Sequence, residues 1–203
     1  MYVPSHFAVS EAEVTRLLAE LTAVDLITAA PTGLHATFLP MLHVPADDGP
    51  GTLQGHVARN NPHWQLADAG DSLAIVRGPD AYISPSWYAS KAEHGRVVPT
   101  WNYLTAHLHG RLVVHDDVEW LRDLVSRLTE QHESRRTDGS PQWAVTDVPP
   151  GYIDGQLRAI VGLELVITRV EAKAKLSQNR PAADRAGVIT GLGPDSDVAR
   201  LMS

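Results

Sequence analysis

Apolar residues recur every three to four positions in two stretches of the chain, as they do along the buried face of an amphipathic helix. The first stretch, residues 14–21, follows Ser10 and Glu13, which have the spacing of a helix-capping box. The second, residues 118–128, follows a pair of aspartates whose charge suits a helix N-terminus. The pattern therefore predicts one helix near the start of the chain and another in its second half.

Most of the remaining apolar residues form short runs that are rich in β-branched residues and end at Pro, Gly, Asn or Asp. Short strands at such spacing favour an antiparallel barrel over a βαβ array. Two longer runs predict longer strands: residues 97–114, with a turn at Gly110, and residues 160–173. The short runs are residues 24–30, 34–39, 41–44, 52–58, 72–76 and 81–83.

The parts of the chain without this pattern predict loops and small helices. Residues 137–151 are rich in Pro, Gly and Asp and predict a loop, and residues 152–157 predict a brief helix. The chain from about residue 178 mixes Pro, Gly and charge, which predicts a surface arm with one or two short helical turns. We expect one mainly β (α+β) domain over residues 1–203, with helices flanking the barrel.

Composition narrows the classes of function. The chain has 203 residues and no cysteine, which excludes a disulfide framework, a thiolate metal site and a cysteine nucleophile. The N-terminus lacks the features of a signal peptide, and no apolar stretch has the length of a membrane span, so we expect a cytoplasmic protein. A formal net charge of −7 does not support a protein whose main partner is DNA.

Four segments combine polar and aromatic side chains at the ends of predicted strands, and they suit a flavin mononucleotide chemically. The phosphate needs cations and hydroxyls, and the ring system needs aromatic neighbours and amide-type hydrogen bonds. Each residue also has a plain interpretation: Arg59 as a turn residue, the Ser84-Pro85-Ser86 run as turn chemistry, and the tryptophans as core anchors. The segments are residues 56–64, 82–91, 98–103 and 173–180, and they contain every lysine of the chain.

These segments also carry a resemblance to a known family. Four runs, in order along the chain, can be compared with that family: Arg59-Asn60-Asn61-Pro62, Tyr82-Ile83-Ser84-Pro85-Ser86-Trp87-Tyr88, Val97-Val98-Pro99-Thr100-Trp101-Asn102-Tyr103 and Lys175-Leu176-Ser177-Gln178-Asn179-Arg180. They are similar to the signature blocks of the PaiB-type FMN-binding negative transcriptional regulators. The opening residues 1–7 and the block Ile160-Val161-Gly162-Leu163-Glu164 match as well. The resemblance extends from Met1 to about Leu192.

The resemblance implies a split β-barrel of the pyridoxamine-phosphate-oxidase-like superfamily, with FMN held at a homodimer interface to which both protomers contribute. It implies phosphate and ribityl contacts at Arg59, Ser84, Lys91 and Thr100. It implies ring contacts at Trp101, Asn102 and Gln178. No catalytic residue is assigned.

Three functional hypotheses follow. The first is a flavin-linked negative transcriptional regulator, and the second is a flavin-dependent oxidoreductase acting on an unidentified small molecule. The third is a haem- or ligand-handling split barrel, because His107 and His109 share one face of a predicted strand. No third ligand stands at a recognisable metal spacing, so we predict no metal site.

Overall fold

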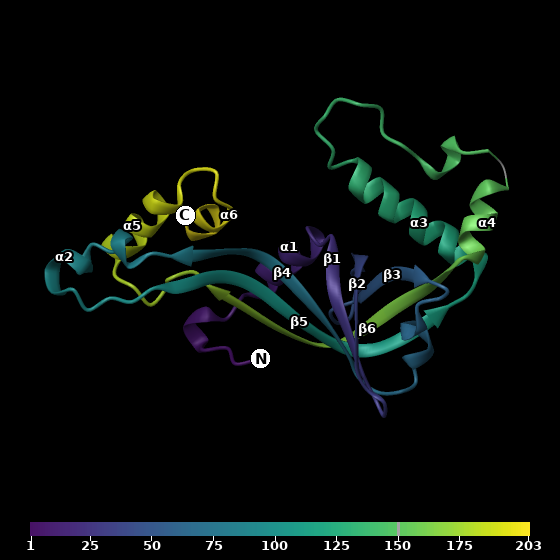
Figure 1. Ribbon diagram of the computed structural model, residues 1–203, viewed down its shortest axis with the longest axis horizontal. Coiled ribbons are helices and arrows are strands. Elements are labelled where there is room, and N and C mark those ends of the chain that lie inside the picture. Colours follow the sequence, from purple (N-terminus) through teal and green to yellow (C-terminus); the bar gives the residue numbers. More distant parts are fainter. Residues whose placement is uncertain (150) are drawn as a thin grey trace. The chain divides into compact units, whose positions relative to one another are not determined.

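The computed structural model describes residues 1–149 and 151–203, which contain six strands together with α-helices and short 3₁₀ turns (Figure 1). Pro150, within the predicted loop 137–151, lies outside the described residues. The strands are β1 (Ala23–Ala30), β2 (Gly33–Val44), β3 (Thr52–Ala58), β4 (Ser72–Ile83), β5 (Thr100–His115) and β6 (Ile160–Lys175). The helices are α1 (Glu11–Ala19), α2 (Ser90–His94), α3 (Val118–Glu133), α4 (Tyr152–Arg158), α5 (Ala182–Leu192) and α6 (Asp197–Met202), with short 3₁₀ turns η1 (Ser5–Phe7), η2 (Pro62–Leu66), η3 (Pro85–Trp87) and η4 (Val145–Asp147).

The strands form a closed barrel in the order β1-β2-β3-β6-β5-β4. β1 pairs antiparallel with both β2 and β4, and β3 pairs antiparallel with β2 and β6. This arrangement, with its flanking helices, confirms the predicted mainly β barrel. No helix among the described residues is both long enough and apolar enough to cross a membrane.

The chain forms two compact units, which we describe separately. The strand-end unit comprises Met1–Thr15, Arg77–His107 and Glu171–Ser203. The barrel unit comprises Arg16–Val76 and Leu108–Val170. β4, β5 and β6 each contribute residues to both units, so the strand-end unit contains the C-terminal ends of β4 and β6 and the N-terminal part of β5.

β2 runs through Pro40, where the sequence predicted a break between two short strands. Pro40 stands opposite Ala23 at the last pair of the β1–β2 ladder, and the β2–β3 ladder begins one residue later, at Met41. Proline is tolerated in a strand where no ladder needs its missing N–H. Pro40 meets this condition because it lies where the β1–β2 ladder ends and the β2–β3 ladder begins. β4 likewise continues through Gly78-Pro79 as one strand.

Gly110 lies inside β5, and the turn predicted at this position is wrong. A Cβ atom at Gly110 would stand 2.2 Å from the backbone oxygen of Val166 on β6. The glycine is therefore explained by the close approach of two backbones rather than by a change of chain direction.

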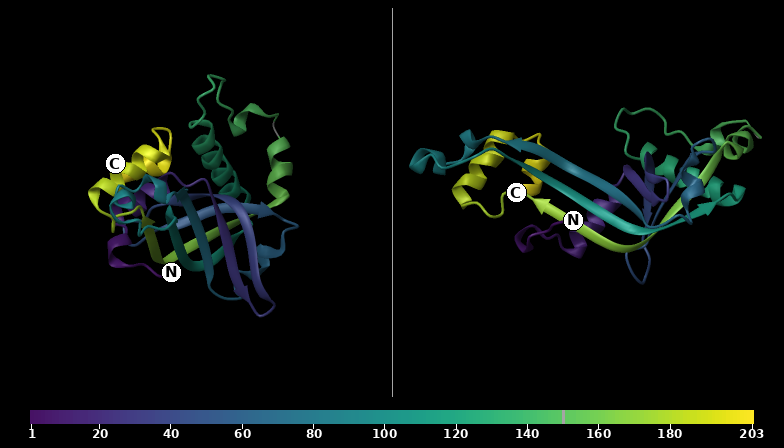
Figure 2. Two further views of the ribbon diagram at one scale, coloured as in Figure 1. Left: turned by 60° about the vertical axis from the view of Figure 1, so that its left-hand side comes forward. Right: turned by 60° about the horizontal axis from the view of Figure 1, so that its bottom comes forward.

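The two predicted helices are confirmed as α1 and α3. Ser10 and Glu13 form the reciprocal capping box that opens α1, with Glu13 N–H donating to Ser10 Oγ at 3.3 Å. α3 runs as one uninterrupted helix (Figure 2). It buries Leu124 and Leu128 against Leu42 of the barrel unit. The predicted apolar stripe of α3 is thus its core face.

The C-terminal part of the strand-end unit is more regular than the predicted surface arm. α5 and α6 bury Val188, Val198 and Met202 in a cluster with the ends of β4 and β6. α5 packs closely on Trp87, since a Cβ at Gly187 would stand 2.0 Å from the Trp87 backbone oxygen and one at Gly191 would stand 2.4 Å from its ring. The two glycines lie on one face of α5, and their lack of a side chain allows this helix to pack closely against η3.

Candidate functional site

The strand-end unit contains all but one of the predicted site residues. Arg59 alone belongs to the barrel unit. All three lysines of the chain also lie in the strand-end unit. The site residues of this unit are Ser84, Lys91, Thr100, Trp101, Asn102 and Gln178.

An aromatic surface lies at the ends of β4 and β5. The side chains of Trp101 and Tyr82 are 52% and 49% exposed, and their ring centroids are 6.3 Å apart in an edge-on arrangement. Large aromatic rings are usually buried in a core when they have no ligand or partner to contact. Two neighbouring rings left half open to solvent therefore indicate a place where a flat, partly apolar ligand can lie.

Two lysines of this unit bind hydroxyl groups. Lys91 Nζ donates to Ser86 Oγ at 3.1 Å, and Lys175 Nζ donates to Thr100 Oγ1. Ser84, at the cap of η3, accepts from the Ser86 N–H at 3.2 Å. An ammonium group next to a hydroxyl keeps its full charge, so both pairs are suited to an anion. By contrast, ion pairs with carboxylates engage Arg59, Arg122, Arg127, Arg136 and Arg200.

The amide side chains of Asn102 and Gln178 serve the interior of the strand-end unit. Asn102 is fully buried and hydrogen-bonded to Ser177 Oγ. Gln178 folds back on its own turn, accepting from Leu176 N–H at 2.7 Å and donating to Ala174 O at 2.6 Å. Both amides therefore shape the end of β6.

The start of α5 joins two segments that are far apart in the sequence. Asp184 is buried and accepts hydrogen bonds from Ser90 N–H at 2.9 Å and from Ser90 Oγ at 2.7 Å. The Ser90 N–H, then the Ser90 hydroxyl, lower the pKa of Asp184 and outweigh its burial. The Arg180 guanidinium lies 4.6 Å from the centre of the Tyr88 ring, at cation–π distance. Asp184 has no recognisable signal in the sequence, because an acid in the first turn of a helix usually needs no partner.

Arg59 is occupied within the barrel unit. Its guanidinium forms a bidentate ion pair with Asp116, with N···O distances of 3.0 and 2.5 Å, and its Nε donates to Arg158 O. The hydrogen bond between the two side chains raises the pKa of Arg59 and lowers that of Asp116. The planar fork that would suit a phosphate is thus already filled by a carboxylate.

A second polar network lies beside α3 and explains the Gly162–Glu164 block. Glu164 accepts from Gln54 at 2.8 Å and contacts His115 Nε2 at 2.7 Å, and His115 stacks on Trp120. A Cβ at Gly162 would stand 2.2 Å from the Trp120 ring, so only glycine leaves room for this stack. Burial alone would raise the pKa of Glu164, but its hydrogen bonds outweigh that effect and lower the pKa. The block therefore joins α3 to the sheet.

The predicted histidine pair lies on β5. His107 and His109 are both half-buried and both take part in other interactions. Within residues 1–149 and 151–203, no group of three or more His, Asp or Glu side chains is placed to hold a metal ion.

The residues of the strand-end unit fit the flavin that the resemblance implies. Trp101 and Tyr82 offer ring faces, and the two lysine–hydroxyl pairs offer positive charge and donors for a phosphate. The hydroxyl of Tyr88 is buried without a hydrogen-bond partner, which adds an unused polar group to the same unit.

Comparisons with known proteins agree with this chemistry. The family described as "Putative FMN-binding domain" matches residues 1–169. The Bacillus subtilis (strain 168) "Protease synthase and sporulation protein PAI 2" is 34% identical over 194 residues, which cover 95% of this chain and 89% of that protein.

Solved structures show the same fold at low sequence identity. The conserved hypothetical protein Rv2991 from Mycobacterium tuberculosis superposes with a TM-score of 0.61 at 14% identity, covering 89% of this chain and 94% of that one. The FAD and heme binding protein from Mycobacterium smegmatis superposes with a TM-score of 0.61 at 15% identity, covering 95% of this chain and 82% of that one. The predicted split β-barrel is thereby confirmed.

Proposed function

This chain belongs to the PaiB-type family of FMN-binding domains, and from that premise we propose that its strand-end unit holds FMN in a flavin-linked regulatory homodimer. FMN is the cofactor of the family, and the position of the flavin on this chain is our proposal. The observation that carries it is that Lys91 and Lys175 bind hydroxyls in the same unit as the half-exposed rings of Trp101 and Tyr82.

The phosphate of FMN is held by the lysine–hydroxyl pairs. Lys91 with Ser86 and Lys175 with Thr100 provide charge together with hydroxyl groups, and Ser84 lies at the cap of the same turn as Ser86. A phosphate that replaces the hydroxyl as acceptor gains charge-assisted hydrogen bonds. Arg59 would have to give up Asp116 to contribute, so we assign the phosphate contacts to the lysines instead.

The ring system lies against Trp101 and Tyr82. Their exposed faces supply the apolar contact area that an isoalloxazine ring needs. Asn102 and Gln178 act indirectly, since their amides are bonded inside the unit. When bound, FMN supplies one- and two-electron redox chemistry, and the protein orients the flavin and shapes its access to solvent.

A second copy of the chain covers an apolar face of the barrel unit. Leu34 and Phe38 of β2 are 79% and 72% exposed. Ala36 and Pro40 are exposed as well, and because alternate residues of a strand share a side, all four side chains point to the same side of β2. A contiguous apolar strand face of this kind is typical of a protein–protein interface. It supports the homodimer that the family resemblance implies.

Regulation through direct DNA contact has little support from the charges. The arginines of α3 are already paired, Arg122 with Asp154 and Arg127 with Asp123, so α3 presents no free basic face from these residues. The net charge of −7 also argues against direct DNA contact. We therefore propose that the flavin state acts through a protein partner. If the purified protein shifted the electrophoretic mobility of the DNA upstream of its own gene at low salt, this proposal would be contradicted.

A flavin-dependent oxidoreductase is the second candidate, and the exposure of Trp101 favours it. A flavin resting on a half-exposed indole stays within reach of dissolved reactants. Bleaching of the bound flavin by NADH or NADPH, followed by turnover with an acceptor, would favour the enzyme. A flavin that stays oxidised with both donors would favour the regulator.

The deciding experiment is an FMN titration of the purified apoprotein, followed by flavin fluorescence. We expect Lys91→Ala and Lys175→Ala each to raise the Kd by about tenfold or more, because a charged hydrogen bond contributes about 1.5–3 kcal/mol. Arg59→Ala should leave the Kd within about twofold, since the structure gives Arg59 other partners.

Arg122→Ala is the matched control, because it removes an exposed, ion-paired cation of the barrel unit. Equal FMN affinity in the wild type and both lysine variants would refute the assigned phosphate site. Loss of binding in Arg59→Ala alone would move the site to the barrel unit.

A further inference from the structure

Asn102 joins three distant segments of the strand-end unit through one buried amide. Its Nδ2 donates to Ser177 Oγ at 3.0 Å and contacts Met202 Sδ at 3.4 Å, and its Oδ1 accepts from the Ser177 hydroxyl at 3.2 Å. The side chain has no exposed surface. β5, the turn after β6 and the end of α6 therefore meet at this residue.

Ser177 has an unusual backbone for its residue type. Its φ of 62° makes it the one non-glycine residue with positive φ in the described part of the chain. Residues with a Cβ atom pay an energetic cost in this left-handed region, which glycine does not. Serine at this position is explained by its hydroxyl, which is buried and satisfied by Asn102. Strain of this kind is most often kept where function needs a fixed geometry.

Met202, near the C-terminus, contacts the same Asn102 amide as Ser177 does. Met202 is buried, and its carbonyl oxygen accepts from Arg185 Nη2 at 3.1 Å. These residues lie beyond residues 1–169, which match the FMN-binding family. The contacts at Asn102 are thus made by a part of the chain that the family description does not cover.

We propose that Asn102, Ser177 and Met202 are positioning residues of the flavin site, and that α6 belongs to that site through them. Neighbouring residues of a strand point to opposite sides, so an inward Asn102 turns the Trp101 ring outward. Ser177 follows Lys175 by two residues, so the fixed turn also sets where Lys175 meets Thr100. The inference rests on the proposed FMN site, to which these residues add geometry and no direct contact.

Replacing Ser177 by glycine separates strain from function. Ser177→Gly relieves the backbone and removes the hydroxyl, so we expect an unchanged or higher midpoint of thermal unfolding. We expect the same variant to raise the Kd for FMN by about three- to tenfold, as the loss of one neutral hydrogen bond implies. Ser177→Ala keeps the strain and loses the hydroxyl, so it should lower the midpoint and weaken FMN binding to the same extent.

Leu201→Ala serves as the matched control, because Leu201 is an exposed neighbour of Met202 on α6 and its loss should leave the Kd within about twofold. A second measurement needs no flavin. Acrylamide quenching of Trp101, read as the difference from Trp101→Phe, should change in Ser177→Gly and remain as in the wild type in Leu201→Ala.

The outcomes distinguish this inference from the proposed function. FMN affinity and Trp101 quenching that both stay at wild-type values in Ser177→Gly and Ser177→Ala would overturn the positioning role, whatever the thermal midpoints do. A wild type without FMN affinity would refute the proposed function, and the quenching experiment alone would then decide whether the three residues position Trp101.

Discussion

His63 is a buried histidine of the barrel unit whose two ring nitrogens both meet threonine hydroxyls. Nε2 lies 2.9 Å from Thr28 Oγ1, and Nδ1 lies 2.8 Å from Thr37 Oγ1. Thr28 continues the chain of hydrogen bonds to Ser72 at 2.7 Å. Burial, and secondarily the nearby His35, lower the pKa of His63. The native barrel therefore favours the neutral form of this imidazole.

The lowered pKa predicts that acid destabilises the protein. Below a pH of about 6.5 the unfolded chain protonates this histidine while the folded chain does not, so stability falls as pH drops through that value until the folded pKa is reached. The slope from one such histidine is at most about 1.4 kcal/mol per pH unit. Urea unfolding at pH 7.5 and 5.5 should show a smaller pH effect in His63→Gln than in the wild type.

His6→Gln is the control, since His6 is exposed. It should keep the full pH effect of the wild type. His56, whose pKa burial also lowers, should leave part of the effect in His63→Gln. An identical pH dependence in wild type and His63→Gln would show that the network tolerates a charged ring.

Single residues differed in how far the sequence could predict them. Lys91 and Trp101 could be proposed as site residues because the family resemblance implies them and their side chains suit a flavin. The roles of Asn102 and Ser177 could not, because their hydrogen bond joins residues 75 positions apart. Local pattern carries no information about such a contact, and Arg59 shows the same limit, since its partner Asp116 is 57 positions away.

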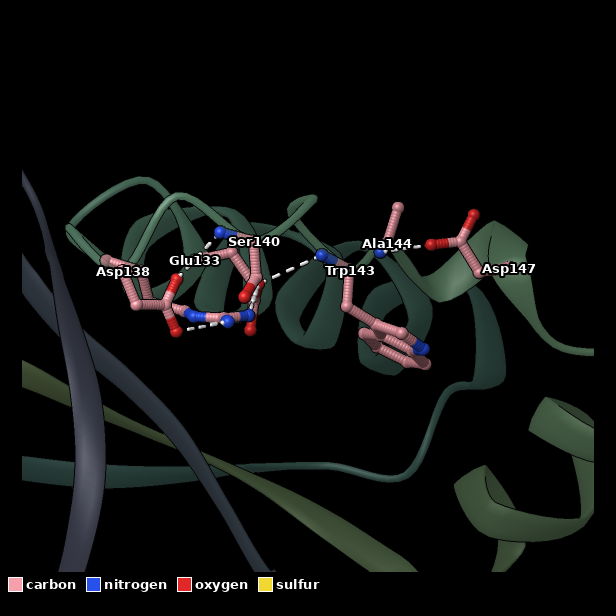
Figure 3. Close-up of polar contacts among 7 residues, drawn as sticks. Glu133, Asp138, Ser140, Trp143, Ala144 and Asp147 are labelled. Carbon is pink, nitrogen blue, oxygen red and sulfur yellow. Dashed lines mark hydrogen bonds and ion pairs between the residues drawn. The ribbon is translucent and has the colours of Figure 1, made fainter.

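The loop after α3 is an element held together mainly by its charges (Figure 3). Glu133, in the last turn of α3, accepts from the Trp143 N–H at 2.9 Å and from Arg136 at 2.7 Å. Arg136 also pairs with Asp138, which accepts from the Ser140 N–H. The Trp143 N–H, followed by Arg136, lowers the pKa of Glu133. The Glu133 carboxylate thus links two residues that are ten positions apart, one at each end of the loop.

We expect this loop to open in acid. A carboxyl whose folded pKa is lowered stabilises the folded loop above its ordinary pKa of about 4.3, and that stabilisation is lost as pH falls through the folded value. Trp143 fluorescence, taken as the difference from Trp143→Phe, should change between pH 5 and pH 3. In Glu133→Gln, Trp143 fluorescence at pH 7 should already equal that of the wild type at pH 3. Glu130→Gln changes an exposed residue of α3 and should behave as the wild type.

Most elements could be predicted from hydrophobic periodicity, and the errors at Pro40 and Gly110 in the strands have one cause. At Pro40 and Gly110 the sequence predicted interruptions, because these residues usually break or turn strands. In the barrel both are accommodated by the neighbouring strands: Pro40 by a change of pairing partner and Gly110 by close contact with Val166. A breaker residue is thus tolerated by the tertiary neighbours, which the local sequence does not specify.

At the scale of the whole molecule, the exposed apolar face of β2 predicts the state of assembly. We expect the wild type to sediment as a dimer and Phe38→Asp to sediment as a monomer, because a charge in an apolar interface is left without solvent. If FMN binds only the assembled form, the variant should also lose flavin affinity by about tenfold or more.

Tyr152→Asp is the matched control, because Tyr152 is an exposed aromatic residue of α4. It should remain dimeric and keep its FMN affinity. A wild type that sediments as a monomer with FMN bound would separate flavin binding from assembly and refute the proposed homodimer.

The distribution of lysines has a practical consequence for anyone handling the protein. The barrel unit contains no lysine, since Lys91, Lys173 and Lys175 all lie in the strand-end unit. Amine-reactive dyes, cross-linkers and immobilisation surfaces will therefore react with lysine side chains only in the strand-end unit, where two of the three lysines belong to the proposed flavin site. Protein coupled to a sensor chip through its lysines would be blocked at that site, so a carboxyl-directed or tag-directed attachment is the safer choice.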